Sequence, residues 1–580
     1  MHPDTLINET LMTMRKFAYL IATLLLLAAP YSANSQAVVV VFSTYIGGSA
    51  DDGFCGIQIA TDSLGYIYTA GYTLSDDIPT EGSAYQPVRN GGYDIFVAKF
   101  DPHLKYLLAA TYLGGSGDEQ YPAIAINHLG QVIITGYTYS GDFPTSSGVL
   151  QPSFGGGASD AFVTILNADL STRISSTYIG GSSVEGPYNK LGLQVSMSNE
   201  IYIAGTTNSG DFPTSPGAYR ESPIGDADIF VSRLSTDLST LVASTYIGGS
   251  GVEAFPNLTF DNSGDVVVGT STGASDYPTT LGAYNRVHSG SYYNGAISKL
   301  DPGLSTLIAS TFVGDVSTCG IAADGDGSFF VVGHSDDVNY PTSVTAYDRT
   351  HNGVNEAIIT KLDNDLENLL ASTFLSGTDN GQGVSNVVDI DANGNVYAGI
   401  ITESSNMPTT PDALDRTHNG GGNDAHIVKF DNDLSTLHYA SFIGGSGDDA
   451  PSSLELDPAG NPVMAGMTKS LDFWTSDNCF EPDYNGGSSD CFVAKFVFEV
   501  EGDSCCIGIT GNVDGDPEEI VDIGDLTALI RYLFIPPTVP PDCMEEANID
   551  GDEAGVVDIG DLTTLIDYLF ISNTSPAVCQ

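Results

Sequence analysis

Apolar and polar residues alternate along most of the chain in short runs, and each run ends at a turn rich in Gly, Asp or Pro. The first complete set comprises the runs 57–60, 66–71, 94–100 and 106–113, each with the period of two that is typical of a β-strand. Tight turns such as Asp62–Gly65 separate the runs. The pattern predicts four short antiparallel strands that form one small sheet.

The same order of strands and turns returns about every 66 residues, seven times. The phrase Ser-Thr-Tyr-Ile-Gly-Gly at residues 43–48 recurs with small changes, and its aromatic residue falls at Tyr45, Tyr112, Tyr178, Tyr246, Phe312, Phe374 and Phe442. Other recurring features are an Asp-x-x-Gly turn, in which the Asp can bond the turn backbone and the Gly supplies a positive φ, and a Pro-Thr pair. In the seventh unit Trp474, the single Trp of the chain, stands in place of that Pro.

Seven sheets that each expose two apolar faces must bury those faces against one another, and radial packing leaves few free edges. The seventh unit ends with its third strand at 490–496, whereas an orphan strand at 38–45 precedes the first unit. This orphan strand would complete the last sheet and close the ring. We therefore expect a mainly β fold, a closed seven-bladed β-propeller over residues 36–498. A solenoid, the alternative, would not need complementary fragments at its two ends.

The repeats resemble the SBBP β-propeller repeat family. The resemblance rests on the phrase Ser43–Gly48, on Phe143-Pro144-Thr145 and on Asp160-Ala161-Phe162-Val163, and it covers roughly residues 38–498. It implies similarity to other secreted and surface-exposed bacterial repeat proteins. It implies no general activity.

The N-terminal residues 1–35 have the three parts of a secretory signal peptide. Basic residues at Arg15 and Lys16 precede an apolar run at 17–29 and a small-residue stretch at 33–35. We expect cleavage after Ser35, with Met14 as an alternative start, and hence a secreted protein that could also attach to the bacterial cell surface. The apolar run is too short for a membrane anchor, which needs about 20 residues, so no membrane span is expected after cleavage.

Composition narrows the range of partners. The chain has 73 Asp and Glu against 18 Lys and Arg, a formal charge of −55, and 41% hydrophobic residues. The hydrophobic content is ample for a packed interior. Such a negative surface repels phosphate backbones and anionic lipid headgroups, which argues against nucleic acid or membrane-surface binding, and it favours divalent cations.

Cysteines concentrate at the C-terminal end, where six of the eight are Cys479, Cys491, Cys505, Cys506, Cys543 and Cys579. An exported protein permits disulfides, and we expect Cys479 to pair with Cys491. Cys505 and Cys506 are expected to pair with Cys543 and Cys579 in an order that the sequence leaves open. Cys55 and Cys319 lie at matching places in two repeats and are interpreted as buried small hydrophobic residues.

Two sets of acidic positions recur in the propeller. The first opens the third strand of each unit, at Asp94, Asp160, Asp228, Asn294, Glu356, Asp424 and Asp490. We expect these side chains to cap turns by accepting backbone N–H bonds; a ring that binds cations or sugar hydroxyls is the alternative. The second set follows the Gly-Gly phrase, at Asp51, Asp52, Asp118, Glu119, Glu185, Glu253, Asp448 and Asp449. We expect it on a solvated rim, with Ca²⁺ binding as the alternative.

The propeller repeats carry no catalytic signature. One active site needs one constellation of residues and therefore breaks repeat symmetry. His288, His351 and His418 are candidates for a metal site, but one His per blade sets them well apart and favours ordinary loop residues. Motifs for a nucleophilic serine, a zinc protease or a phosphate loop are absent from the sequence. We predict no catalytic residue, and a pair of carboxylates for glycoside cleavage stays open.

The pattern changes after a connection at 499–504. Residues 505–580 hold two copies of a segment, at an interval of 36, in which alternate Asn and Asp residues lead into an amphipathic helix. Oxygen side chains on a tight loop suit a hard cation with six to eight ligands. The helices carry Leu526, Leu529, Ile530, Leu533 and Phe534, and Leu562, Leu565, Ile566, Leu569 and Phe570, so their apolar faces should pack together.

Residues 505–580 resemble a type I dockerin, a pair of loop-helix calcium motifs related to half EF-hands. The resemblance implies two Ca²⁺ ions, held by Asn512, Asp514, Asp516, Asp522 and Asp525, and by Asn548, Asp550, Asp552, Asp558 and Asp561. It also implies a cohesin-like or cell-surface protein as partner. Each loop is two residues longer than the family pattern, and the usual hydroxyl pair for partner recognition is replaced by Ile523-Gly524 and Ile559-Gly560. Calcium that only folds the domain is the alternative.

These features together predict a secreted or cell-surface binding or scaffold protein. Its propeller would recognise a polysaccharide or protein ligand, and its tail would mediate docking or assembly. One alternative is a glycoside hydrolase or lyase of an extracellular polysaccharide-degrading system. Another is a calcium-stiffened structural or adhesion protein.

Overall fold

The computed structural model describes residues 38–499, apart from 54–55, 81, 188–189, 376 and 378–386, and, near the C-terminus, 526, 529–530, 532–533, 559–566 and 569. The chain divides into two compact units, Val39–Phe498 and a second unit made of Met1–Val38 and Glu499–Gln580. The predicted signal peptide, 1–35, lies outside the described residues.

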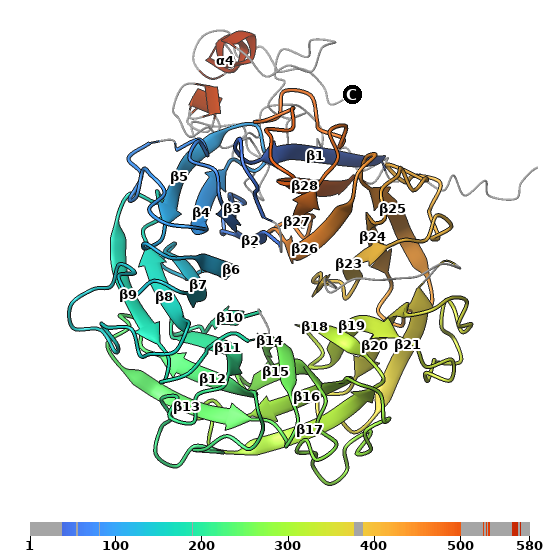
Figure 1. Cartoon of the computed structure of the whole chain (residues 1–580). Helices are drawn as coiled ribbons and strands as arrows, with labels where there is room; N and C mark the ends of the chain where they lie inside the picture. Colours follow the sequence, from blue (N-terminus) through green and yellow to red (C-terminus); the bar gives the residue numbers. More distant parts are fainter. Residues whose placement is uncertain are drawn as a thin grey trace, which may run out of the picture. The chain divides into compact units, whose positions relative to one another are not determined.

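The first unit is a ring of seven four-stranded antiparallel sheets, which confirms the predicted fold (Figure 1). The first strand of each blade, in the orders that follow, lies toward the centre of the ring, and the fourth lies at its outer edge. The first three blades are β2 (Gln58–Thr61), β3 (Ile67–Thr73), β4 (Asp94–Phe100) and β5 (Leu107–Leu113); β6 (Glu119–Ile126), β7 (Val132–Thr138), β8 (Asp160–Leu166) and β9 (Arg173–Ile179); and β10 (Gly192–Val195), β11 (Ile201–Thr207), β12 (Asp228–Leu234) and β13 (Leu241–Ile247).

The next three blades repeat this order: β14 (Glu253–Phe260), β15 (Val266–Thr272), β16 (Asn294–Leu300) and β17 (Leu307–Gly314); β18 (Ser317–Ala323), β19 (Phe329–Ser335), β20 (Glu356–Leu362) and β21 (Leu369–Leu375); and β22 (Val387–Ile390), β23 (Val396–Thr402), β24 (Asp424–Phe430) and β25 (Leu437–Ile443). The second and third strands pair in full register, as from Ile67↔Phe100 to Thr73↔Asp94. Their side chains are almost all buried because each blade packs on both faces.

The seventh blade is completed by the N-terminal strand, as the sequence predicts. Its order is β26 (Asp449–Leu456), β27 (Pro462–Thr468), β28 (Asp490–Glu499) and β1 (Val38–Ile46). The Tyr45 amide donates to the Glu481 carbonyl (3.0 Å), and its hydroxyl donates to the Ser470 carbonyl (2.8 Å). These bonds join the two ends of the propeller sequence and close the ring.

The aromatic residue of the repeated phrase anchors each blade. The buried Tyr112 hydroxyl donates to the Ser75 carbonyl (3.0 Å) and accepts from the Ile78 amide (3.0 Å). Phe312 and Phe374 lack that hydroxyl, and their blades carry a tyrosine earlier in the repeat instead. There the Tyr277 hydroxyl pairs with Ser298 and the Tyr340 hydroxyl with Thr360, both at 2.9 Å. A buried hydroxyl therefore keeps a partner in either arrangement.

The predicted Asp-x-x-Gly turns are confirmed. At the first of them the Asp62 carboxylate accepts from the Leu64 amide (3.0 Å) and the Tyr66 amide (3.1 Å). Gly65 has a φ of 79°, which only glycine adopts without strain. In the blades that carry it, this turn fixes the register of the two inner strands, and hence which side chains face the centre of the ring.

The predicted disulfide between Cys479 and Cys491 is wrong, because both thiols are free. Cys491 is the second residue of β28 and is fully buried. Its sulfur packs against Gly53 of the next blade, and not against the loop that holds the half-buried Cys479. Cys505, Cys506, Cys543 and Cys579 lie outside the described residues, as do Cys55 and the side chain of Cys319.

In the second unit the structure describes one helix, α4 (Ile559–Ile566). Leu565 of this helix and Leu529 are buried in one apolar cluster, with Leu526, Leu533, Leu562 and Leu569 packed against it. These contacts join leucines from both predicted helices, but the paired helices themselves stay a prediction. Within the described part of the chain, none of the helices has the length and hydropathy to span a bilayer.

Candidate functional site in the central channel

One position of the innermost strands differs in chemistry between repeats and carries the two acids of the channel. It is the second-to-last residue of each innermost strand, two residues before the first residue of the turn that leads to the second strand of the blade. Its occupants in chain order are Ala60, Ala125, Gln194, Thr259, Ala322, Asp389 and Glu455. The two acids therefore come from neighbouring blades, the sixth and seventh. This ring breaks the sevenfold symmetry.

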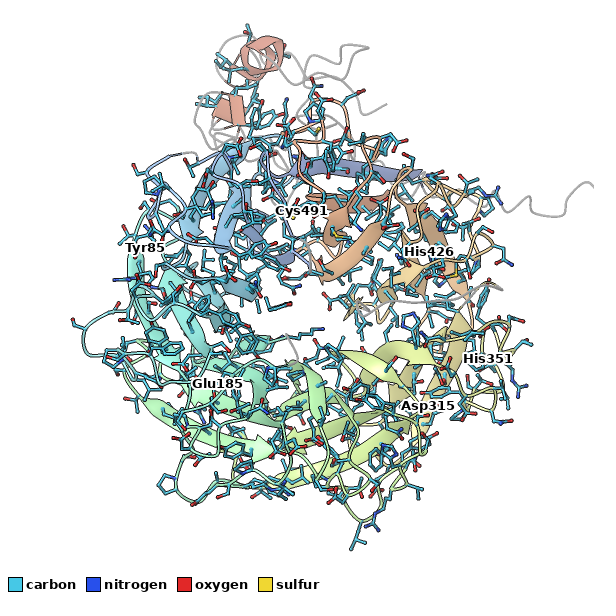
Figure 2. The ribbon with its side chains drawn as sticks, in the orientation of Figure 1. Tyr85, Glu185, Asp315, His351, His426 and Cys491 are labelled. Atoms are coloured by element: carbon cyan, nitrogen blue, oxygen red, sulfur yellow. The ribbon has the colours of Figure 1, made fainter. Side chains whose placement is uncertain are left out.

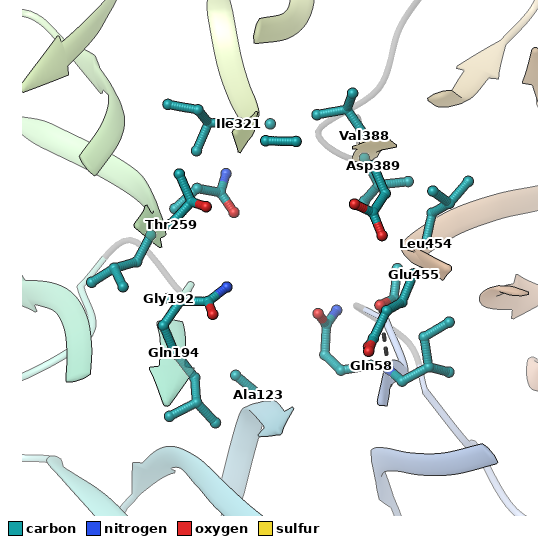
Figure 3. Close-up of a pocket in the computed structure, with 18 of the residues that line it drawn as sticks. Gln58, Ala123, Gly192, Gln194, Thr259, Ile321, Val388, Asp389, Leu454 and Glu455 are labelled. Atoms are coloured by element: carbon teal, nitrogen blue, oxygen red, sulfur yellow. Dashed lines mark hydrogen bonds between the residues drawn. The ribbon is translucent and has the colours of Figure 1, made fainter. Parts of the chain in front are cut away.

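Each of the two acids is held by the blade that follows its own. The Asp389 carboxylate, on β22, accepts from the Leu456 amide of β26 (2.9 Å). The Glu455 carboxylate, on β26, accepts from the Thr61 amide (3.3 Å) and hydroxyl (3.4 Å) of β2. Figure 3 shows both side chains on one wall of the channel. Contacts between strands thus fix the positions of both carboxylates.

The channel raises the pKa values of both acids to different extents. Burial raises the pKa of Glu455 to about 8, and the neighbouring Asp389 carboxylate adds to this rise. Burial also raises the pKa of Asp389 to about 6, against which the Leu456 and Ile390 amides act by stabilising the charged form. Both acids therefore hold protons more tightly than in water, and Glu455 does so more strongly than Asp389.

The rest of the channel wall is lined by amides, hydroxyls and small apolar groups. The cavity has a volume of about 390 Å³. Gln194 and Thr259 face the acids from the opposite wall, and Asn257 also lines the cavity (Figure 3). Gln58 stands beside Glu455, and its amide donates to the Ser452 carbonyl (3.0 Å). The site thus offers hydrogen-bond donors and acceptors from at least four blades.

The first predicted set of acids caps turns, as expected. The Asp94 carboxylate accepts from the Asn90 amide (2.8 Å), and the Asp490 carboxylate accepts from the Asn485 amide (2.6 Å). Asp228 accepts from two amides in the same way. All seven members of the set, Asn294 included, are buried. None of them lines the central channel.

The prediction of a solvated rim is wrong for part of the second set. Asp52, Glu119, Glu185, Glu253 and Asp449 are fully buried. Glu119, Glu253 and Asp449 begin inner strands, whereas Asp52 and Glu185 form isolated bridges to Thr73 and Thr207 ahead of theirs. At all five places the chain passes between two blades, so these side chains are shielded from solvent. Their neighbours Asp51, Asp118 and Asp448 remain partly exposed. The buried acids meet members of the first set, as described below.

The three loop histidines do not come together. Each packs edge-on against the phenylalanine of its own blade: His288 against Phe312, His351 against Phe374 and His418 against Phe442, with ring centroids 5.4 to 6.0 Å apart. Among the described residues no group of three metal-ligating side chains occurs. Figure 2 shows how widely the polar side chains spread over the ring, from Tyr85 to His351 and His426.

The ten predicted calcium ligands fall outside what the structure describes, namely Asn512, Asp514, Asp516, Asp522, Asp525, Asn548, Asp550, Asp552 and Asp558, together with the side chain of Asp561. Their assignment stays a prediction. Trp474 is 43% exposed and borders a smaller cavity of about 120 Å³ with Leu414 and Phe442, between the sixth and seventh blades.

The sequence analysis missed the acids of the channel, although it stated the criterion that finds them, namely that a site breaks the symmetry of the repeats. Asp389 and Glu455 stand two residues before the turn residues Asp391 and Asp457. An alignment of the seven repeats on that turn, and not on the aromatic phrase, would have shown a column that contains Ala, Thr and Gln as well as Asp and Glu.

Residues 41–79 match the SBBP β-propeller repeat family. No curated protein matches the sequence. One similar solved structure is a protein of unknown function from Dyadobacter fermentans, with 14% identity and a TM-score of 0.35 over 64% of this chain and 96% of that one. The polysaccharide lyase Uly1 is similar with 8% identity and a TM-score of 0.40 over 78% of this chain and 90% of that one. An α-L-arabinofuranosidase of Fusarium graminearum is similar with 11% identity and a TM-score of 0.34 over 63% of this chain and 93% of that one.

Proposed function

We propose that this protein is a secreted or cell-surface binding protein whose propeller takes a carbohydrate chain at the central channel. The observation that carries the proposal is the ring position at which Gln194, Thr259, Asp389 and Glu455 break an otherwise regular repeat. Repeats that only build a scaffold have no need for one polar arc, whereas a binding site needs one constellation.

The chemistry of the arc suits sugar hydroxyls. Carboxylates accept hydrogen bonds, amides both donate and accept them, and a hydroxyl group does either. Such a set can satisfy the many hydroxyls of a saccharide. The cavity of about 390 Å³ lies in the usual size range of small-ligand pockets and is closed on its sides by seven strands. It suits one end or a short stretch of a sugar chain better than the broad surface of a folded protein.

The test is retention of the calcium-loaded mature protein on a panel of immobilised plant, algal and bacterial polysaccharides. Selective retention on one polysaccharide supports the proposal. Asp389→Asn and Gln194→Ala should then each weaken binding by about 5- to 100-fold, since a lost buried hydrogen bond costs about 1–3 kcal/mol. A matched control is Asp226→Asn, because Asp226 is an exposed acid of an outer loop.

Two outcomes contradict the proposal. If no polysaccharide retains the protein, the channel does not serve carbohydrate, and the search turns to protein ligands. If a polysaccharide retains the Asp389→Asn and Gln194→Ala variants as well as the parent protein, the binding surface lies elsewhere, and the loops around Trp474 become the next target.

A second candidate function is glycoside or uronide cleavage, which the unequal pKa values of the two acids favour. A protonated Glu455 can donate to a leaving oxygen, while an ionised Asp389 can act as base or nucleophile. Incubation with a retained polysaccharide should then release new sugar ends. Glu455→Gln and Asp389→Asn should each lower the rate at least about 100-fold, while Asp226→Asn leaves it unchanged. Unaltered polysaccharide after long incubation rules this candidate out.

We further propose that the tail, residues 505–580, binds two Ca²⁺ ions and docks the protein to a cohesin-like or cell-surface partner. The packing of Leu529 with Leu565 supports the loop-helix arrangement that such a domain requires. Calorimetric titration of the full chain with Ca²⁺ should give two sites. Asp514→Asn with Asp550→Asn should abolish both, since these acids stand at matching places in the two loops. Unchanged calcium binding in the double variant contradicts the assignment.

A further inference from the structure

Buried carboxyl groups meet in pairs at the junctions between blades. The acid that opens the third strand of one blade meets the acid that precedes or begins the first strand of the next. The pairs are Asp94 with Glu119, Asp160 with Glu185, Asp228 with Glu253, Asp424 with Asp449, and Asp490 with Asp52 across the ring closure. All ten side chains are inaccessible to solvent.

The two carboxyl groups of each pair face the first glycine of the repeated Gly-Gly phrase. At Gly180 a Cβ atom would lie 2.6 Å from the Asp160 Cγ and 2.8 Å from the Glu185 Oε2. The same geometry recurs at Gly47, Gly114, Gly248 and Gly444. A side chain at these glycines would collide with both acids.

In the pairs Asp160–Glu185 and Asp228–Glu253 the two oxygens that face the glycine have no hydrogen-bond donor. The Asp160 Oδ2 accepts from the Gly155 amide (2.5 Å), and the Glu185 Oε1 accepts from the Thr207 hydroxyl (2.9 Å). The remaining oxygens, Asp160 Oδ1 and Glu185 Oε2, are buried without a partner. Asp228 Oδ1 and Glu253 Oε2 are likewise buried without a partner. In the other three pairs only the facing oxygen of Asp94, Asp424 or Asp490 lacks a donor, because the facing oxygens of Glu119, Asp449 and Asp52 accept from the Gly115, Gly445 and Gly48 amides. A buried oxygen of this kind costs free energy unless a ligand satisfies it.

The fourth junction shows that the two acids belong together. There the third strand opens with the neutral Asn294. The facing position of the fifth blade, directly before Ser317, is occupied by the buried Val316. Where one carboxyl group is missing, the other is therefore replaced by an apolar side chain. An acid that only capped a turn or a strand would not depend on its neighbour in this way.

A proton fits the gap better than a metal ion does. Ca²⁺ takes six to eight oxygen ligands, but the other polar neighbours of Asp160 and Glu185 are N–H and O–H donors, such as the Thr207 and Ser209 hydroxyls. Gly180 fills the space on the remaining side. The described part of the chain contains no group of three ligating side chains. One proton placed between two carboxyl oxygens satisfies both.

We propose that each carboxyl pair binds one proton, which one oxygen donates to the other as a hydrogen bond, and that the pair thereby latches neighbouring blades together in a pH-dependent manner. Loss of the proton to solvent leaves two carboxylates face to face, and at Asp160–Glu185 and Asp228–Glu253 neither facing oxygen then has a donor. The ligand at these five sites is thus a proton, and a divalent cation is the alternative that the test must exclude.

The electrostatic surroundings of the Asp160–Glu185 pair agree with this assignment. Burial raises the pKa of Glu185 to about 8, with a further contribution from the Asp160 charge, and burial raises the pKa of Asp160 to about 6. The other titratable groups that face the pair are the phenols of Tyr137, Tyr178 and Tyr246. At the remaining junctions the pairs are also faced by Arg89, Arg220, His418, Asp77, Glu481, Asp415 and Asp448.

The sign of the pH effect follows from these directions. The folded-state pKa of each paired acid is raised above its unfolded value, so folding takes up protons between the two values. The stabilisation is complete below the unfolded pKa, near 4, and is lost as pH rises through about 6 to 8. The full chain should therefore unfold at a lower temperature at pH 8.5 than at pH 5.

The test uses thermal unfolding of the full mature chain in calcium-depleted buffer from pH 5 to pH 8.5. In Glu185→Gln the amide donates permanently to Asp160, as the protonated acid would. This variant should match the parent protein near pH 5, unfold at a higher temperature than the parent at pH 8.5, and take up about one proton fewer on folding. The control Asp226→Asn should retain the parent's dependence on pH. Should Glu185→Gln not fold, Asp160→Asn tests the same proton.

Two results would overturn the proposal. One is a Glu185→Gln variant whose unfolding temperature has the same pH dependence as the parent protein. The other is a Ca²⁺-dependent stabilisation of the parent protein at pH 8.5 that Glu185→Gln loses, since this would assign the gap to a divalent cation. The infrared C=O stretch of a protonated carboxyl group gives an independent readout, and it should weaken in Glu185→Gln at pH 6.

Discussion

Single glycines carry much of the specificity of this propeller. The first glycine of five of the repeated phrases lies between two carboxyl groups, whereas other glycines of the same blades, such as Gly141, lie in open loops. Gly180 and Gly141 illustrate the contrast. A Cβ atom at Gly180 would collide with Asp160 and Glu185, but at Gly141 it would meet nothing within 4 Å. The two glycines therefore differ in the room that their surroundings leave for a side chain.

We predict that Gly180→Ala lowers the free energy of unfolding by about 1–3 kcal/mol, because an added methyl group in a tightly packed site displaces its neighbours. Chemical denaturation of the full chain measures the effect. Gly141→Ala serves as the control and should be neutral or slightly stabilising, since it restricts the unfolded chain without a clash. Equal effects of the two substitutions would refute the close approach at Gly180.

At the level of the strand, β1 is the element on which ring closure depends. It forms the outer edge of the seventh blade, although its sequence precedes the first. Besides the backbone hydrogen bonds to β28, its Tyr45 hydroxyl accepts from the Phe473 amide (2.9 Å), and its Ser43 amide donates to the Ser476 hydroxyl (3.1 Å). A strand held by backbone pairing and a few side chains can be supplied from outside, as in other cases of strand addition.

A chain that starts after Ile46 should therefore unfold at a lower temperature and be cleaved faster by proteases. A synthetic peptide of residues 38–46, added in excess, should restore much of the lost stability. A peptide of the same composition in scrambled order should not restore it. If the truncated chain is as stable as the parent protein, then β1 does not latch the ring.

The blades and their closure could be predicted from the sequence because both depend on local patterns. Alternation, turn residues and a fixed period specify a four-stranded sheet, and complementary fragments at the ends specify closure. Contacts between blades could not be predicted in this way. The errors at Cys491 and at the buried Glu185 share one cause: both side chains point across a junction to a residue of the neighbouring repeat, and no local pattern records that contact.

The candidate site lies between these extremes. Its ring position can be found from the sequence once the turns are aligned, but the proximity of Asp389 and Glu455 depends on the order of blades around the channel. Blades six and seven are neighbours in sequence and in space, so the pairing of the two acids follows from the propeller fold. The rise in their pKa values depends on burial in the channel and is not accessible from sequence.

The whole molecule must hold together against its own charge, because 73 acidic residues face only 18 basic ones. Exposed loop acids relieve part of this burden locally: the Asp211 carboxylate accepts from the Ser182 amide (2.8 Å), which lowers its pKa. Long-range repulsion between blades remains. Dissolved salt screens such repulsion over distances beyond about 8–10 Å at ionic strengths of 0.1–0.15 M.

The ring should consequently become more stable as monovalent salt is added. Raising NaCl from about 10 mM to about 300 mM shortens the screening length from about 30 Å to below 8 Å, so the unfolding temperature at pH 7.5 should rise by several degrees. Buried carboxyl pairs are screened far less than surface charges, and the difference in unfolding temperature between Glu185→Gln and the parent protein should persist at high salt. A stability that is independent of salt would mean that the surface acids are already neutralised by bound cations, and removal of those cations with a chelator should then restore the salt dependence.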